Sequence, residues 1–157
     1  MNPRFRYAAA GLSLLLSAPL PAAWAAGPMK PVVVELTEVP CQFLEPERGE
    51  NHGFKSIKRS DCEAINAESA DKRLAAAKIL RLKPGHHIFR VTNRSVPYET
   101  GFWLRGNGVL DRLSLPSVKG GGVQVGKTRD FEILLEEGEY VYSCPFSPTP
   151  PYRLIVE

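Results

Sequence analysis

The last twenty residues of this chain, 138–157, place the strongest limit on what it can fold into. They begin with a turn glycine, after which Tyr140, Tyr142 and Cys144 share one parity. Four prolines between 145 and 151 then separate this stretch from an apolar run at 152–156. Because the side chains of a strand alternate between two faces, the pattern predicts two strands joined by a stiff loop, with Cys144 at the end of the first.

The same alternation recurs further upstream. It predicts strands at 32–37, 79–82, 86–93, 100–105 and 127–135. In the last of these, Phe131, Ile133 and Leu135 face one side, while Asp130 and Glu132 face the other, which is typical of a half-buried strand. About seven short strands with frequent turn residues between them predict an all-β sandwich.

One segment, at about 45–77, does not fit the strand pattern. Residues 45–60 are polar and contain glycine, which indicates a loop. Residues 61–77 are rich in helix formers, and Ser60 or Asp61 is suited to cap a helix there. We therefore expect a short helical insertion between the first two strands.

The N-terminal residues 1–25 have the layout of a secretory signal peptide. Two arginines precede an apolar stretch at 8–20, which is too short to span a bilayer, and A-W-A at 23–25 fits a cleavage site. This predicts a periplasmic protein whose single domain covers 26–157, with no membrane insertion of the mature chain. An uncleaved anchor is the alternative.

Charge and motifs exclude several classes of function. Loss of residues 1–25 removes two arginines and no acid, which lowers the formal net charge of +3 by two. No basic stripe is interleaved with aromatic residues, so we expect no nucleic-acid partner. No nucleophile and base stand in a recognisable catalytic arrangement, so we do not expect an enzyme.

Two longer runs resemble the cupredoxins. The run L-K-P-G-H-H-I-F-R-V-T-N at 82–93 is similar to a strand pair with a tight glycine turn that ends in asparagine. The run F-E-I-L-L-E-E-G-E-Y-V-Y-S-C at 131–144 is similar to the strand pair that leads into the metal-binding cysteine. The resemblance implies a cupredoxin-like Greek-key β-sandwich. However, no histidine or methionine follows Cys144, so the blue-copper ligand set is absent.

A closer resemblance is to the cupredoxin-like domain of EfeO-type periplasmic iron-uptake proteins. That family carries a cysteine soon after the first strand, a glutamate after the asparagine loop, and a cysteine in a G-E-Y-x-x-x-C context. Cys41, Glu99 and Cys144 match these positions, Glu99 with a one-residue shift. The resemblance implies that the three residues bind a copper or iron ion at one end of the sandwich, for metal handling or uptake with a periplasmic or inner-membrane partner protein.

The three cysteines leave their pairing open. A Cys41–Cys62 disulfide would tie the insertion to the first strand, a common arrangement in an oxidising compartment. A Cys41–Cys144 disulfide would leave no thiolate pair for a metal. With no disulfide, both of these cysteines would be available as ligands. His52, in the insertion loop, is interpreted either as an ordinary loop residue or as a metal ligand.

Two hypotheses of different classes follow. The first is a metal-binding protein with Cys144 as the central ligand and Cys41 and Glu99 as helpers. The second is a metal-free interaction module, held by a Cys41–Cys62 disulfide, that binds a partner through Phe102, Trp103 and Phe146. An electron carrier with a conventional copper centre is not expected, because such a centre needs two histidines around the cysteine.

Overall fold

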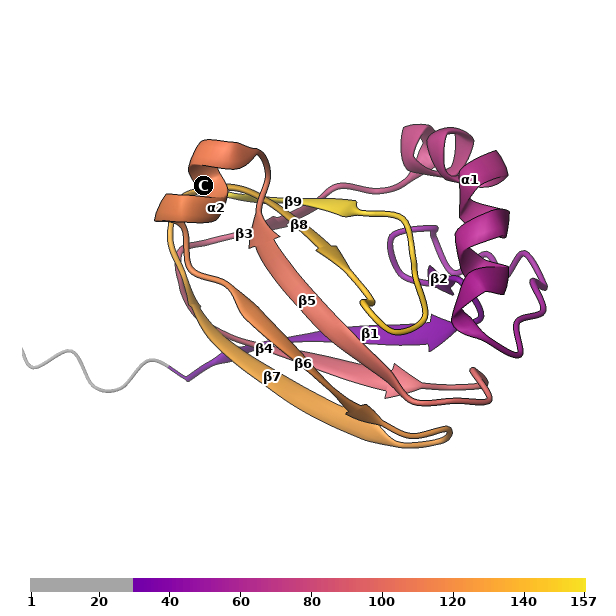
Figure 1. Cartoon of the computed structure of the whole chain (residues 1–157). Coiled ribbons are helices and arrows are strands. Elements are labelled where there is room, and N and C mark those ends of the chain that lie inside the picture. Colours follow the sequence, from indigo (N-terminus) through magenta and orange to yellow (C-terminus); the bar gives the residue numbers. More distant parts are fainter. Residues whose placement is uncertain (1–29) are drawn as a thin grey trace, which may run out of the picture.

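Eleven elements follow one another in residues 30–157, the part of the chain that this computed structural model describes (Figure 1). The predicted signal peptide at 1–25 lies outside the described residues. In chain order the elements are β1 (Val32–Val39), β2 (Gln42–Phe43), α1 (Arg59–Ala76), β3 (Leu80–Leu82), β4 (Gly85–Asn93), β5 (Thr100–Gly106), α2 (Val109–Ser114), β6 (Val118–Val123), β7 (Thr128–Leu135), β8 (Gly138–Ser143) and β9 (Tyr152–Val156). Neither helix is both long and apolar enough to cross a membrane.

The strands form two mixed sheets. One has the order β2-β1-β4-β7 and the other the order β3-β9-β8-β5-β6. The pairs β1–β4 and β3–β9 are parallel, and the other pairs are antiparallel. The coarse prediction of a mostly-β, two-sheet fold is therefore confirmed.

The core lies between the two sheets and follows the predicted parity. In β7, Phe131, Ile133 and Leu135 are buried, while Leu134 is exposed. Tyr140, Tyr142 and Cys144 are buried as well, in line with the parity read from the sequence. The other large side chains in this cluster are Leu36, Phe43, Phe89, Phe102, Leu104, Tyr152, Leu154 and Val156.

The insertion contains one helix, as expected. The 18-residue α1 begins at Arg59, two residues before the predicted start, and follows the two-residue strand β2. The sequence also left 106–122 without regular structure, whereas the chain forms α2 and the edge strand β6 there. The three glycines of β6 hid the strand, because glycine lowers intrinsic strand propensity, while α2 has only six residues and is too short for a helical periodicity to be recognised.

Candidate functional site

The candidate site lies at the end of the sandwich where β1, β4 and β8 end and β5 begins, which we call the cysteine end (Figure 1). Cys144 directly follows β8, and Glu99 directly precedes β5. Cys41 lies in the turn between β1 and β2. The topology thus brings the three predicted metal positions to one end of the molecule, although their side chains differ in surroundings.

Cys41 is bonded to Cys62 in a disulfide, with the two Cα atoms 4.9 Å apart. Both residues are completely buried. Of the pairings that the sequence left open, this is the one that ties the helical insertion to the end of β1. While the bond is intact, Cys41 has no free thiolate to offer, and this separates it from the predicted ligand set.

Cys144 is the free cysteine of the described chain, and its side chain is buried. The backbone N–H groups of Gly101 and Ser147 donate to its Sγ at 3.3 and 3.2 Å. Burial raises the pKa of the thiol strongly, and the nearby charge of Glu38 raises it further. Cys144 is therefore protonated at neutral pH and does not have the environment of a reactive nucleophile.

Helix α1 packs against the loop that follows Cys144 and forms hydrogen bonds with it. Arg59 donates from Nη1 to the carbonyl of Pro145, and Asn66 donates from Nδ2 to the carbonyl of Pro148, both at 2.7 Å. The Sγ of Cys62 lies 3.7 Å from the Oγ of Ser147. The insertion thus covers the cysteine end, and its disulfide adjoins the same loop as Cys144.

The sequence analysis missed Glu38, which lies beside Cys144 and is completely buried. Neither of its carboxylate oxygens has a hydrogen-bond partner in residues 30–157. Burial raises the pKa of Glu38 to about 8, and the polar groups of Cys144, Thr100 and Ser147 offset this only in part. The carboxyl group is therefore mostly neutral at pH 7, because burial disfavours its charged form and no basic side chain of residues 30–157 forms an ion pair with it.

A signal for Glu38 was present in the sequence. It has the parity of Val34 and Leu36 in β1, and Leu36 belongs to the core. Alternation along the strand therefore places a carboxylate on the inward face, where ionisable groups are rare unless they are paired. An unpaired acid at such a position is a reason to look for a function there.

Glu99 has a different environment and is exposed. Its Oε1 accepts a hydrogen bond of 2.8 Å from the backbone N–H of Gly122, and its Oε2 accepts one of 3.2 Å from Nε2 of Gln124. Gly121 lies against this carboxylate and Phe146, and a Cβ at 121 would lie 2.8 Å from Oε1 of Glu99, so a larger residue there would displace one of these side chains. Both oxygens of Glu99 are thus engaged by the β5–β6 edge.

Within residues 30–157, no three side chains of His, Cys, Asp or Glu lie close enough together to hold a metal ion. Cys144, Cys41 and Glu99 therefore do not form a ready ligand set in this structure. Of these three residues, Cys144 has a buried acidic neighbour, Glu38.

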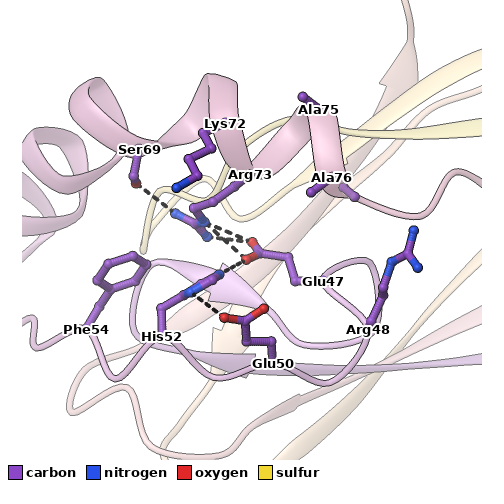
Figure 2. A pocket seen from close by; sticks show the side chains of 11 residues that line it. Glu47, Arg48, Glu50, His52, Phe54, Ser69, Lys72, Arg73, Ala75 and Ala76 are labelled. Atoms are coloured by element: carbon purple, nitrogen blue, oxygen red, sulfur yellow. Dashed lines mark hydrogen bonds and ion pairs between the residues drawn. The ribbon is translucent and has the colours of Figure 1, made fainter.

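A second polar cluster lies between α1 and the insertion loop, around a cavity of about 680 Å³ (Figure 2). Figure 2 shows His52 between two carboxylates. Its Nε2 lies 2.5 Å from Oε2 of Glu47 and its Nδ1 lies 3.3 Å from Oε1 of Glu50. His52 is therefore engaged by two glutamates.

Glu47 is the centre of this cluster. Arg73 donates to it from both Nε and Nη2, with the Nη2–Oε1 distance 2.6 Å, and the hydroxyl of Tyr152 donates to it as well. Burial alone would raise the pKa of Glu47, but these hydrogen bonds and the charge of Arg73 outweigh it, so the pKa is lowered. The hydrogen bonds of Glu47 to Arg73 and Tyr152 tie α1 to β9.

Comparison with known proteins gives no relative for this chain: no family model matches it, and no curated protein matches it.

Proposed function

We propose that this chain is an exported, cupredoxin-like protein with Greek-key strand order that binds a copper or iron ion at its cysteine end. In this proposal Glu38 and Cys144 are the protein ligands, and the protein acts in metal handling or uptake. Cys144 keeps the central position expected from the sequence. Glu38 replaces Glu99 as the carboxylate, and Cys41 serves to hold the disulfide.

The carboxyl group of Glu38 is the single observation that supports this function best. It is completely buried with both oxygens unpartnered among the described residues, and the sulfur of Cys144 is its neighbour. An unsatisfied buried carboxyl group destabilises a fold, so its presence calls for an explanation such as an ion that is bound in the working protein. A cation placed between an acid and a thiol would satisfy both.

The two donors also limit the kind of ion. Thiolate sulfur favours Cu(I), whereas carboxylate oxygen favours harder ions such as iron. Both groups must lose their protons to bind, so binding should weaken as the pH falls. With no imidazole in the proposed set, a conventional blue-copper absorption band is not expected.

Metal titration of the purified protein with its disulfide intact tests the proposal. Under anaerobic conditions, Cu(I) and Fe(II) are added against a competing chelator, and bound metal is measured after desalting. The wild type is expected to retain one of the two ions, while Glu38→Gln and Cys144→Ser both lose it. If the wild type retained neither ion, the metal function would be refuted.

Glu99→Gln is the matched control, because it makes the same chemical change at an exposed carboxylate of the same end. We expect this variant to bind metal as the wild type does. If Glu99→Gln abolished binding and Glu38→Gln did not, the ligand set implied by the family resemblance would be right and the assignment of Glu38 would be wrong.

The second candidate function is a metal-free interaction module held by the disulfide. It is favoured by the use of Cys41 in the disulfide, which removes one thiolate from the cysteine end. Its proposed contact surface needs revision, because Phe102 is buried in the core while Phe146 is 41% exposed. Full titration of the Cys144 thiol in denaturant, unchanged by prior addition of Cu(I), would support this module over a metal site.

A further inference from the structure

A second cavity, separate from the cysteine end, lies over the outer face of the five-stranded sheet. Its volume is about 560 Å³, which is within the usual range for a small-molecule site. Residues of β5, β8 and β9 contribute to its floor, while α2 and the segment 74–79, which runs from the last turn of α1 to the start of β3, contribute to its walls. Figure 1 shows α2 at the opposite end of the molecule from most of α1.

The residues lining this cavity are strongly biased in charge. Four of them are basic and none is acidic: Lys78, Arg105, Arg112 and Arg153. Arg153 has an ion-pair partner, because its Nη2 lies 3.0 Å from Oε2 of Glu139. In residues 30–157 the other three make no ion pair within 4 Å.

Arg105 is held in place with most of its hydrogen-bonding capacity unused. Its guanidinium lies over the ring of Trp103, with Cζ 4.0 Å from the ring centroid, and its Nη1 donates to Oγ of Ser143 at 3.1 Å. This is its one hydrogen bond to the described protein, and its buried Nε has no acceptor there. The guanidinium is therefore positioned before any ligand arrives, which lowers the entropy that binding would cost.

Burial lowers the pKa of Arg105, and the nearby charge of Arg112 lowers it further. Two guanidinium groups that face one cavity repel each other. An anion bound between them would be attracted to both and would offset this repulsion. Guanidinium groups match the geometry of carboxylate and phosphate oxygens especially well.

The remaining lining is apolar. Apart from the polar Asn107, it consists of Leu74, Ala75, Ala77, Ile79, Val141 and Pro151. A bare inorganic ion would leave this surface uncovered, whereas a ligand with a short hydrocarbon part would bury it.

We propose that this cavity binds a small organic anion, in which a phosphate or carboxylate group contacts Arg105 and Arg112 and a short apolar body contacts the segment 74–79. The site is distinct from the proposed metal site, since neither Glu38 nor Cys144 lines it, although Pro151 ends the loop that follows Cys144. We call it the basic cavity.

Fluorescence of Trp103 provides the test, because its ring is stacked on the arginine that would bind the anion. The full chain is used with Trp24→Phe, which removes the other tryptophan of the sequence. The probes are hexyl phosphate, hexanoate and inorganic phosphate, with hexanol as the uncharged comparison. We expect saturable binding of hexyl phosphate or hexanoate, weaker binding of inorganic phosphate, and no saturable response to hexanol.

Variants identify the residues responsible. Arg105→Gln is expected to weaken binding of the better probe about tenfold, as loss of a hydrogen bond to a charged group would. Arg112→Gln, at an exposed position where folding is not at risk, is expected to weaken it severalfold. Lys127→Gln removes the same charge from an exposed turn outside the cavity and should have no effect.

Three results would overturn the proposal. Equal response to hexanol and hexyl phosphate would show a site without charge recognition. Unchanged affinity in both arginine variants would place the anion elsewhere. Absence of saturable binding by every charged probe would show that the basic cavity takes no such ligand. The ratio of the affinities for hexyl phosphate and hexanoate shows whether the cavity prefers a phosphate or a carboxylate group.

Discussion

Glu38 and Glu47 are both glutamates with buried side chains, one at the cysteine end and the other beneath α1. Glu47 accepts hydrogen bonds from Arg73 and Tyr152 and lies against His52. Glu38 has no hydrogen-bond partner among residues 30–157 and no nearby cation. The difference teaches that burial alone does not define a site: Glu47 is part of the scaffold because its partners are supplied by the protein, whereas Glu38 still lacks one.

The largest loss of stability is expected when Glu47 loses its ion-pair partner, Arg73. Arg73→Met would leave Glu47 buried without its main partner, and breaking a buried pair in this way costs about 3–5 kcal/mol. The free energy of unfolding, measured with urea at pH 7, gives the value. If the free energy of unfolding fell by less than about 1 kcal/mol, as is usual for exposed pairs, the Glu47 cluster would not be what holds α1 against β9.

The disulfide should come next in size. It closes a loop with a sequence separation of 21, so replacing both cysteines by alanine in Cys41→Ala/Cys62→Ala is expected to cost roughly 3 kcal/mol. Urea unfolding of the double variant is compared with that of the wild type. Equal stability would show that α1 is held over the cysteine end by its hydrogen bonds and packing alone.

Glu38 and Glu47 should differ most clearly in how they make the free energy of unfolding depend on pH. The pKa of Glu38 is raised from 4.5 to about 8 in the folded state, so the folded protein holds a proton that the unfolded chain has lost between these values. Stability from this group is fully present below pH 4.5 and falls by about 1 kcal/mol per pH unit as the pH rises toward 8. Glu38→Gln keeps the shape and should remove this slope.

The matched substitution Glu47→Gln should act in the opposite direction. The pKa of Glu47 is lowered, so its contribution is present at neutral pH and is lost as the pH falls below 4.5. Unfolding in urea at several pH values between 2.5 and 8 measures both variants. A wild type whose stability rose from pH 5 to pH 8 and an unchanged slope in Glu38→Gln would together contradict the assigned state of Glu38.

The smallest effect is expected from an ion pair on the surface. Glu63 lies 2.7 Å from Nε of Arg59 one turn away on α1, and both side chains are at least half exposed. Glu63→Gln should cost about 0.3–0.5 kcal/mol, as is usual for exposed helix pairs. Thermal unfolding compares Glu63→Gln with Arg73→Met. A similar loss of stability in the two variants would show that the buried ion pair contributes no more than the exposed one.

Much of the fold could be predicted from local patterns in the sequence. The alternation of Phe131, Ile133 and Leu135 and the shared parity of Tyr140 and Tyr142 were enough to predict two strands and their buried faces, since strand periodicity is a property of neighbouring residues. The glycine-rich segment 106–122 could not be predicted in the same way. Its helix and strand depend on packing against β5, which no local pattern reports.

The candidate site was harder to predict than the fold for a related reason. Cys144 was identified from its place after a strand, but its neighbour Glu38 is more than a hundred positions away in the sequence. Glu99 was assigned by resemblance, and the contacts that engage it come from Gly122 and Gln124. Likewise, nothing in the sequence pairs Glu47 with Arg73, because their contact forms only when α1 packs over the insertion loop.

The most direct test of the metal proposal is infrared difference spectroscopy of the protein before and after addition of the ion that it retains. Wild-type protein at pH 7 should show a protonated carboxyl band, absent from Glu38→Gln, and a thiol S–H band, absent from Cys144→Ser. The account predicts that both bands disappear together when one equivalent of metal is added. Persistence of both bands at saturating metal would contradict it, because the ion would then lie elsewhere or not bind at all.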